Sequence, residues 1–159
     1  DFLLTFHHPS VGTLLDPGFF PHRVVGTDSL VAVRSAVLAE TDAGLPLLSH
    51  ARNSFLGRVA AVAQSRGGSD PPVTVHTNEN AMAEALKVMA LEGHGLAWLP
   101  RSLVARDLAE GRLLASGESL PLEIRLYRNA AHRRAAVAAV WQAAEAIADQ
   151  TMRNANGGD

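Results

Sequence analysis

The hydrophobic pattern of residues 78–112 constrains the fold of this chain more than any other feature, because its period changes twice within that segment. The first part has apolar residues at the spacing of one helical face, at Met82, Ala85, Leu86, Met89 and Ala90. Gly93 and Gly95 follow, and glycine can end a helix in a left-handed conformation. The all-apolar run 96–99 then predicts a strand buried on both faces, and a second helix is expected over about 102–111. This order is typical of an open α/β sheet, in which ligands bind at the carboxyl ends of the strands.

The rest of the chain alternates in the same way. The predicted strands are 1–6, 22–25, 30–33, 45–49, 73–77 and 122–127. The second and third of these are expected to flank a turn or bulge, and 73–77 is expected to be half-buried. One further helix is predicted to begin after Asn53 or Ser54 and to end near Arg66, and another covers about 132–152. Residues 151–159 are predicted to form a disordered tail.

Composition excludes several classes of function. The chain has 159 residues, of which 47% are hydrophobic and 19% charged, as expected of one globular domain. Its net charge of −2 and its scattered arginines provide no basic stripe, so we expect no direct nucleic-acid binding by these residues. The absence of cysteine excludes disulfides, Cys-ligated zinc and thiol nucleophiles. No apolar run is long enough for a membrane span, and no secretory signal opens the chain. Because the first residue is Asp, we expect that the natural N-terminus lies upstream.

No catalytic or metal-binding motif stands out. The seven histidines form no H-x-x-x-H or H-E-x-x-H pattern, so neither a bound metal nor another cofactor is expected. The sequence also has no G-x-S-x-G elbow, no Walker A loop and no G-x-G-x-x-G turn after a strand. We therefore expect that the chain is not an enzyme.

Three segments resemble the effector-binding domain of LysR-type transcriptional regulators. They are LPLLSHARNSFLGR (45–58), TNENAMAEALKVMALEGHGLAWLP (77–100) and RSLVARDLAEGRLL (101–114). Within that family the chain is most similar to the hypochlorite-responsive branch, which has a comparable R-N-S-x-x-G-R run and a matching G-x-G-[IL]-A-W-L-P strand. The similarity extends from Asp1 to about Ala148.

The resemblance implies an α/β fold of the periplasmic-binding-protein-like type II, with two Rossmann-like lobes joined by two crossover strands. On that template lobe I holds 1–10 and 96–150, and lobe II holds 11–95. Lobe I is incomplete, because the family's domain normally begins with another strand, a helix and a further strand ahead of the position of Asp1. The helix-turn-helix module and linker helix of the family are also absent from these residues.

The resemblance also implies a function and its partners. It implies a cytoplasmic domain that senses a small-molecule effector or an oxidant in the cleft between its lobes, in a homodimer or homotetramer. The intact protein would contact DNA only through a helix-turn-helix module outside this chain, with no membrane contact. The alternative is a periplasmic-type solute-binding protein of the same architecture.

Seven residues are candidates for lining that cleft. Arg52, Asn53 and Ser54 are expected at a strand-to-helix turn, where backbone N–H groups and an arginine fork favour an anion. An ordinary helix cap beside a surface arginine is the alternative for these three residues. Asn78 and Asn80 either cap the next helix or face the cleft.

Met82 and His7 complete the set. The thioether of Met82 could be oxidised reversibly to a sulfoxide, which would turn an apolar contact polar. Its alternative is a filler of the core, on the stripe that it shares with Met89. His7 is expected at a crossover, where a titrating imidazole would make binding depend on pH.

Overall fold

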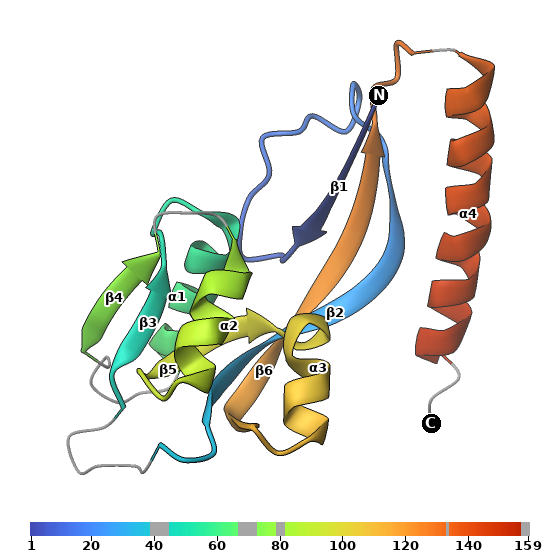
Figure 1. Cartoon of the computed structure of the whole chain (residues 1–159). Coiled ribbons are helices and arrows are strands. Elements are labelled where there is room, and N and C mark those ends of the chain that lie inside the picture. Colours follow the sequence, from blue (N-terminus) through green and yellow to red (C-terminus); the bar gives the residue numbers. More distant parts are fainter. Residues whose placement is uncertain (39–44, 67–72, 79–81, 133, 157–159) are drawn as a thin grey trace. The chain divides into compact units, whose positions relative to one another are not determined.

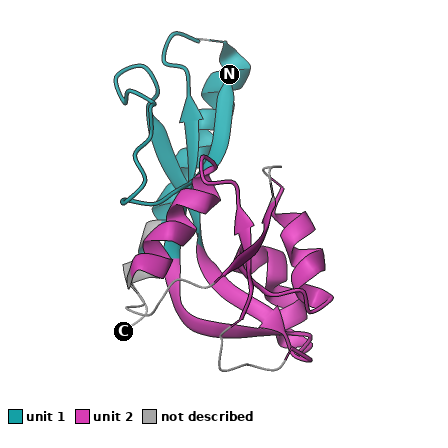
Figure 2. Ribbon diagram, turned by 90° about the vertical axis from the view of Figure 1, so that its left-hand side faces the viewer, with its two compact units in different colours: residues 1–28, 121–159 teal, residues 29–120 magenta. Residues whose placement is uncertain are grey.

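A computed structural model describes the chain except for residues 39–44, 67–72, 79–81, 133 and 157–159. Its described residues divide into two compact units, which are coloured separately in Figure 2. Unit 1 holds residues 1–28 and 121–159, and unit 2 holds residues 29–120. Two long strands, β2 (His22–Ser35) and β6 (Leu113–Arg128), contribute residues to both units. The chain therefore passes between the units twice, and strand pairing runs in the order β1-β6-β2-β5-β3-β4.

Unit 1 is built from β-strands and one long helix. Strand β1 (Phe2–His7) pairs antiparallel with the end of β6, with Phe2 opposite Arg128 and His7 opposite Glu123. Helix α4 (Ala135–Asn156) buries a stripe at helical spacing, formed by Val137, Trp141, Ala144 and Ala148. The guanidinium carbons of Arg23 and Arg128 lie 5.0 and 4.7 Å from the ring centroid of Trp141. These cation–π contacts join α4 to β2 and β6.

Unit 2 is a three-layer α/β unit. Strand β5 (Leu96–Pro100) pairs antiparallel with β2 and parallel with β3 (Leu47–His50), which pairs parallel with β4 (Thr74–Asn78). Helix α1 (Phe55–Arg66) connects β3 to β4, and α2 (Ala83–Leu91) connects β4 to β5. These two connections run in opposite directions along the sheet, so right-handed crossovers place the helices on opposite faces, as Figure 1 shows.

The main core lies on the face of unit 2 that α2 and α3 (Arg101–Ala109) cover. Its members alternate along the strands and recur at helical spacing along α2. They are Val31, Val33, Leu48, Ala83, Leu86, Ala90, Ala97, Leu99, Val104 and Leu113. Strand β5 has a neighbouring strand on each side, as expected of a central strand. The predicted burial of 96–99 holds on one face only, because Ala97 and Leu99 lie in the main core whereas Leu96 and Trp98, on the opposite face, are half-buried.

Glycines end both helices of this core, as their positions in the sequence predict. Gly93 follows α2 with φ 81°, and Gly111 follows α3 with φ 69°, a region that side chains with a Cβ rarely adopt. The His94 N–H donates to the carbonyl of Met89, and the Arg112 N–H donates to that of Asp107. These bonds satisfy carbonyls that the last helical turn leaves without a partner.

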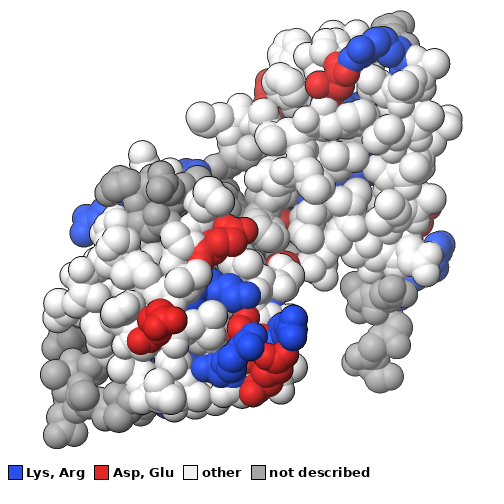
Figure 3. Space-filling model, in the orientation of Figure 1, with Lys and Arg blue, Asp and Glu red and all other residues white. Residues whose placement is uncertain are grey.

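A buried carboxylate links α2, α3 and the residue that precedes β6. The Asp107 side chain is 2% exposed, and its Oδ2 lies 2.7 Å from the Nζ of Lys87. Its Oδ1 accepts hydrogen bonds from Arg112 Nε and Nη2, at 3.0 and 2.6 Å. Lys87 Nζ also donates to the carbonyl of Leu103. On the face shown in Figure 3, acidic and basic side chains are interspersed over this part of unit 2.

The structure differs from several of the predicted elements. Residues 22–25 and 30–33 belong to one strand, β2, so the prediction of two strands around a turn is wrong, because the chain stays extended through 26–29. The alternative of a bulge within 26–29 stays a prediction. Strand β4 is present over Thr74–Asn78, but residues 73–77 are exposed and not half-buried, since β4 is an edge strand. Residues 151–156 are helical and not a disordered tail, because α4 continues to Asn156. Residues 157–159 lie outside the described part of the chain.

Met82 does not lie where the helical pattern predicts, and the two compact units have other bounds than the predicted lobes. Met82 is 64% exposed and precedes α2 in an extended conformation, so the helical stripe begins at Ala83. The predicted boundaries assigned 96–120 to the same lobe as residues 1–10. In the structure β5 and α3 pack in unit 2 with β2 and β3, and residues 11–28 belong to unit 1.

Candidate functional site

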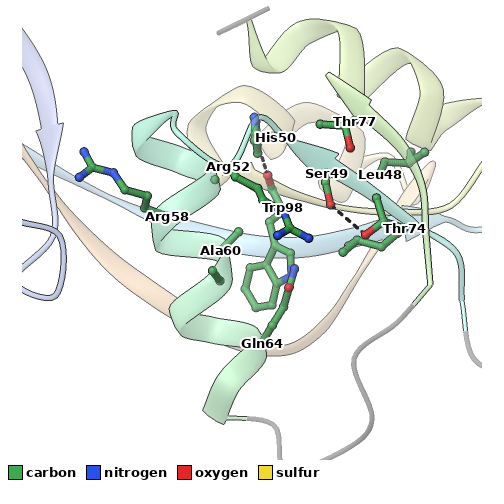
Figure 4. Close-up of a pocket in the computed structure, with 13 residues that line it drawn as sticks. Leu48, Ser49, His50, Arg52, Arg58, Ala60, Gln64, Thr74, Thr77 and Trp98 are labelled. Carbon is green, nitrogen blue, oxygen red and sulfur yellow. Dashed lines mark hydrogen bonds between the residues drawn. The ribbon is translucent and has the colours of Figure 1, made fainter. Parts of the chain in front are cut away.

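A pocket of about 490 Å³ opens on the α1 face of unit 2. Its walls come from β3, from Thr74 and Thr77 of β4, from one side of α1 and from Trp98 of β5 (Figure 4). All of these elements belong to unit 2. The volume lies in the range of small-molecule sites.

Small side chains on α1 leave this space open. Ala60 and Ala61 line the pocket with methyl groups only, where larger side chains would fill the gap between the helix and Trp98. Alternate residues of β5 face opposite sides of the sheet. Ala97 and Leu99 face the main core, so Trp98 faces the other side, where it is half-buried. The indole therefore lies on the α1 face, at the wall of the pocket.

The turn from β3 to α1 places Arg52 at the pocket. Ser54 is the N-cap of α1: its Oγ accepts the Gly57 N–H at 3.0 Å and donates to the Ala51 carbonyl at 2.7 Å. A Cβ on Gly57 would lie 2.1 Å from the Ala51 oxygen, so only glycine permits this tight turn. Arg52 is exposed, and in Figure 4 its side chain extends past β3 toward Ser49 and Thr74.

The pocket is positively charged. Arg52 and Arg58 are its charged lining residues, and no acidic side chain is among the described residues that line it. The Arg58 side chain points away from Trp98 in Figure 4, whereas Arg52 points toward the hydroxyls of Ser49 and Thr74. Those two hydroxyls lie 3.5 Å apart, and either can donate to the other. Such an arrangement favours an anionic, acceptor-rich ligand.

His50 ends β3 beside the pocket and is 4% exposed. Its Nε2 lies 2.8 Å from the Trp98 carbonyl, which can only accept, so Nε2 carries the proton of this bond. Burial lowers the pKa of His50 below its ordinary value, and the bond to the Trp98 carbonyl opposes that shift. Burial thus favours the neutral imidazole, whose Nδ1 can accept a hydrogen bond.

Of the predicted site residues that the structure describes, Arg52 alone lines this pocket. Asn53 is exposed at the same turn, and the Ser54 hydroxyl is engaged in the helix cap. Asn78 pairs with His50 across β3 and β4, so its backbone lies beside the same turn. Asn80 lies outside the described residues, and Met82 precedes α2 with an exposed side chain.

His7 lies in unit 1, at the end of β1. Burial, together with the positive charge of Arg125, lowers its pKa, and the carboxylate of Glu123 opposes the shift. The carboxylate of Glu123 is itself bound by Arg125, whose Nε donates to Oε2 at 2.7 Å. His7 therefore tends to be neutral at neutral pH.

Sequence reasoning missed Trp98, Gln64, Ser49 and Thr74. Trp98 was assigned only to a buried strand, and the other three residues gave no pattern of their own. The consecutive alanines at 60 and 61 were the available signal, because small residues on the sheet-facing side of a helix leave room beside an aromatic neighbour.

The described part of the chain holds neither a cluster of metal ligands nor a helix that could span a membrane. Among those residues no three His, Asp or Glu side chains gather as metal ligands would. None of the helices found there is both long and apolar enough to cross a membrane.

Comparison with known proteins extends these observations. Residues 20–148 match the family model of the LysR substrate binding domain. The HTH-type transcriptional regulator YjiE of Escherichia coli K12 is 31% identical over 86 residues, which are 52% of this chain and 28% of that protein. The HTH domain-truncated transcriptional regulator QseD of Escherichia coli O157:H7 shows the same identity over 86 residues, which are 35% of its length. The alignment thus spans about a third of these relatives.

The fold also matches a solved structure. The regulatory domain of HypT from Salmonella typhimurium superimposes with a TM-score of 0.77 at 21% identity, covering 94% of this chain and 73% of that one. At this identity the likeness concerns the fold, and it confirms the predicted periplasmic-binding-protein-like architecture. Because the family model matches most of its length, the chain belongs to the LysR substrate-binding domain family.

Proposed function

We propose that this chain is the effector-binding regulatory domain of a LysR-type transcription regulator. The observation that carries the proposal is the family match over 20–148, joined to a pocket of small-molecule size that holds Arg52 and no described acidic side chain. The intact regulator would act in the cytoplasm as a homodimer or homotetramer. It would contact DNA through a helix-turn-helix module outside these residues.

Sensing requires that the effector bind two states of the regulator with different affinity. A ligand that bound both states equally would shift nothing, however tightly it bound. The strands β2 and β6 each contribute to both units, so they are the covalent routes by which binding in unit 2 would affect unit 1. Typical coupling changes affinity about 5- to 150-fold.

Arg52 is the residue that we assign to the anionic part of the effector. Asn53 and Asn78 lie at or beside the same turn, and Asn80 follows Asn78 in the sequence. Ser54 supports the turn through its cap, which positions Arg52. Titration of the His7 imidazole, which lies in unit 1, would make the response depend on pH.

Oxidant sensing is the more specific form of this proposal. The full-length structure of HypT from Salmonella typhimurium is described as that of a hypochlorite-specific LysR-type transcriptional regulator. Met82 presents an exposed thioether at the start of α2. Hypochlorous acid would transfer its oxygen to that sulfur and release chloride and a proton, giving a sulfoxide that reductases reverse.

The test measures operator-DNA affinity of the full-length regulator with and without hypochlorite and a panel of small acids. We expect one condition to change the affinity by at least about fivefold. If the sulfoxide of Met82 carries the signal, Met82→Leu abolishes the hypochlorite response.

Met89→Leu is the matched control, because Met89 is in the same helix but packs partly buried against the core. A full hypochlorite response in Met82→Leu would retire the oxidant mechanism. An unchanged operator affinity under every condition would retire the regulatory proposal itself.

A further inference from the structure

We propose that the pocket on the α1 face of unit 2 binds a flat anionic molecule, such as an aromatic carboxylate, between Arg52 and the indole of Trp98. The proposal rests on the proposed function, because it names the chemical class of the effector and locates its site. It places the whole ligand within unit 2, since every element that lines the pocket belongs to that unit.

The first argument is the charge of the pocket. Neither Arg52 nor Arg58 forms an ion pair with another described residue, and the described lining includes no Asp or Glu. Arg112, Arg23 and Arg125 each have a carboxylate partner within 2.8 Å. A guanidinium that has no protein carboxylate beside it is available to a carboxylate of the ligand, which it can bind with two parallel hydrogen bonds.

The second argument is an excess of hydrogen-bond donors. Among the described residues, the indole N–H of Trp98 and the side-chain amide of Gln64 have no hydrogen-bond partner. The hydroxyls of Ser49 and Thr74 lie at the wall that Arg52 approaches. One of them can donate to the other, which leaves one hydroxyl proton for a ligand. Each of these groups can donate to an acceptor of a ligand, so this wall of the pocket suits a carboxylate group.

The third argument is the shape of the apolar part. Trp98 is half-buried, and Ala60 and Ala61 of α1 line the same space, so the indole has apolar neighbours on the helix side but is not covered (Figure 4). Aromatic rings prefer offset-stacked or edge-to-face partners, which a planar group in this space would provide. The volume of about 490 Å³ accommodates such a molecule.

The probes are benzoate, its neutral isostere benzamide, and cyclohexanecarboxylate, which keeps the charge but lacks a flat ring. Each is titrated into the full-length protein without DNA, and binding is followed by calorimetry and by amide and indole N–H chemical shifts. We expect benzoate to bind at millimolar concentration or tighter and to shift the Trp98 indole resonance. Benzamide and cyclohexanecarboxylate should each bind more weakly.

Arg52→Gln and Arg58→Gln form a matched pair, because both arginines line the pocket but only Arg52 points toward Ser49 and Thr74. Arg52→Gln should lower the affinity for benzoate about 10- to 100-fold, because a hydrogen bond to a charged group contributes about 1.5–3 kcal/mol. Arg58→Gln should change the affinity less than about threefold. Trp98→Leu should abolish the preference for benzoate over cyclohexanecarboxylate, and unchanged backbone shifts outside the pocket show that each variant is folded.

The proposal is overturned if no probe binds, if Arg52→Gln binds benzoate like the wild type, or if Arg58→Gln loses as much affinity. It is also overturned if cyclohexanecarboxylate matches benzoate. These outcomes are separate from the regulatory proposal. An effector that changes operator affinity equally in wild type and Arg52→Gln supports regulation and overturns this site, whereas benzoate that binds through Arg52 without changing operator affinity supports the site alone.

Discussion

At the scale of single residues, Asp107 is a buried carboxylate with two basic partners in unit 2. Lys87 of α2 and Arg112, which directly precedes β6, both contact this carboxylate. Asp107→Asn would leave the ammonium of Lys87, which is only 25% exposed, without its counter-charge. We expect a loss of about 3–5 kcal/mol in the free energy of unfolding, measured by urea denaturation, because breaking a buried pair leaves an uncompensated charge.

Glu110→Gln is the control for Asp107→Asn. Glu110 pairs with Arg106 and Arg112, but its side chain is 39% exposed. Exposed ion pairs contribute about 0–1 kcal/mol, so this variant should be close to the wild type. Equal losses in the two variants would contradict the role of the buried carboxylate.

The contribution of Asp107 also depends on pH with a definite sign. The hydrogen bond from Lys87 lowers the pKa of Asp107 below its ordinary value of 3.8; burial opposes this shift, and the bond from Arg112 adds to it. A depressed folded-state pKa means that the stabilisation is complete above the unfolded-state pKa and is lost as the pH falls through the folded-state pKa. The difference in the free energy of unfolding between wild type and Asp107→Asn should therefore be constant from pH 5 to 7, because this range lies about one to three pH units above the ordinary pKa of Asp. The difference should shrink in stronger acid.

The residues of the candidate site show how far a sequence can be interpreted. Arg52 could be predicted, because a polar turn between a strand and a helix is a local pattern. The role of Trp98 could not be predicted in this way. Its exposure depends on Ala60 and Ala61, which are distant in the sequence and line the same pocket only in the fold. Met82 was placed on a helical stripe, but the first residue before a helix does not follow the helical period.

At the scale of elements, the turn between β3 and α1 determines where Arg52 lies. Gly57→Ala would place a Cβ 2.1 Å from the Ala51 carbonyl oxygen and 3.0 Å from the Ser54 Oγ that caps the helix. The backbone would have to shift, so we expect a loss of about 1–3 kcal/mol in thermal or urea unfolding. Ligand binding through Arg52 should weaken as well.

Gly12→Ala provides the comparison, since nothing lies within 4 Å of the position that its Cβ would occupy. We expect a change within about 0.5 kcal/mol, as for most surface substitutions. A Gly57→Ala protein as stable as Gly12→Ala would show that the turn tolerates a side chain and does not fix Arg52.

Elements of 4–12 residues were predictable from local patterns, and the long strands were not. Helix α1, helix α3 and strand β5 follow from their periodicity and their glycines. Strands β2 and β6, of 14 and 16 residues, were recognised only in part. Each changes its neighbours along its length because it serves both units, so no single burial pattern runs through it.

At the scale of the whole molecule, the strands β5 of unit 2 and β1 of unit 1 differ in their pairing and burial. In unit 2, β5 is paired on both sides and its Ala97 and Leu99 are fully buried. In unit 1, β1 is at the end of the strand order, pairs only with β6 among the described strands, and leaves Leu3 and Leu4 49% and 61% exposed. Opening β1 therefore exposes little additional apolar surface, whereas opening β5 disrupts the main core.

We predict that native-state hydrogen exchange of the full chain proceeds through local opening of β1 well before β5 opens. Amides of β1 should exchange with a lower opening free energy than those of β5, and urea should accelerate β5 exchange more steeply, because only the latter opening exposes a large area. Residues 113–120 of β6 belong to unit 2, so the opening free energies of their amides should be closer to those of β5 than the values for residues 121–128 are. Equal protection of β1 and β5 would mean that the two units unfold as one cooperative body, and an effector bound in unit 2 would then stabilise both to the same extent.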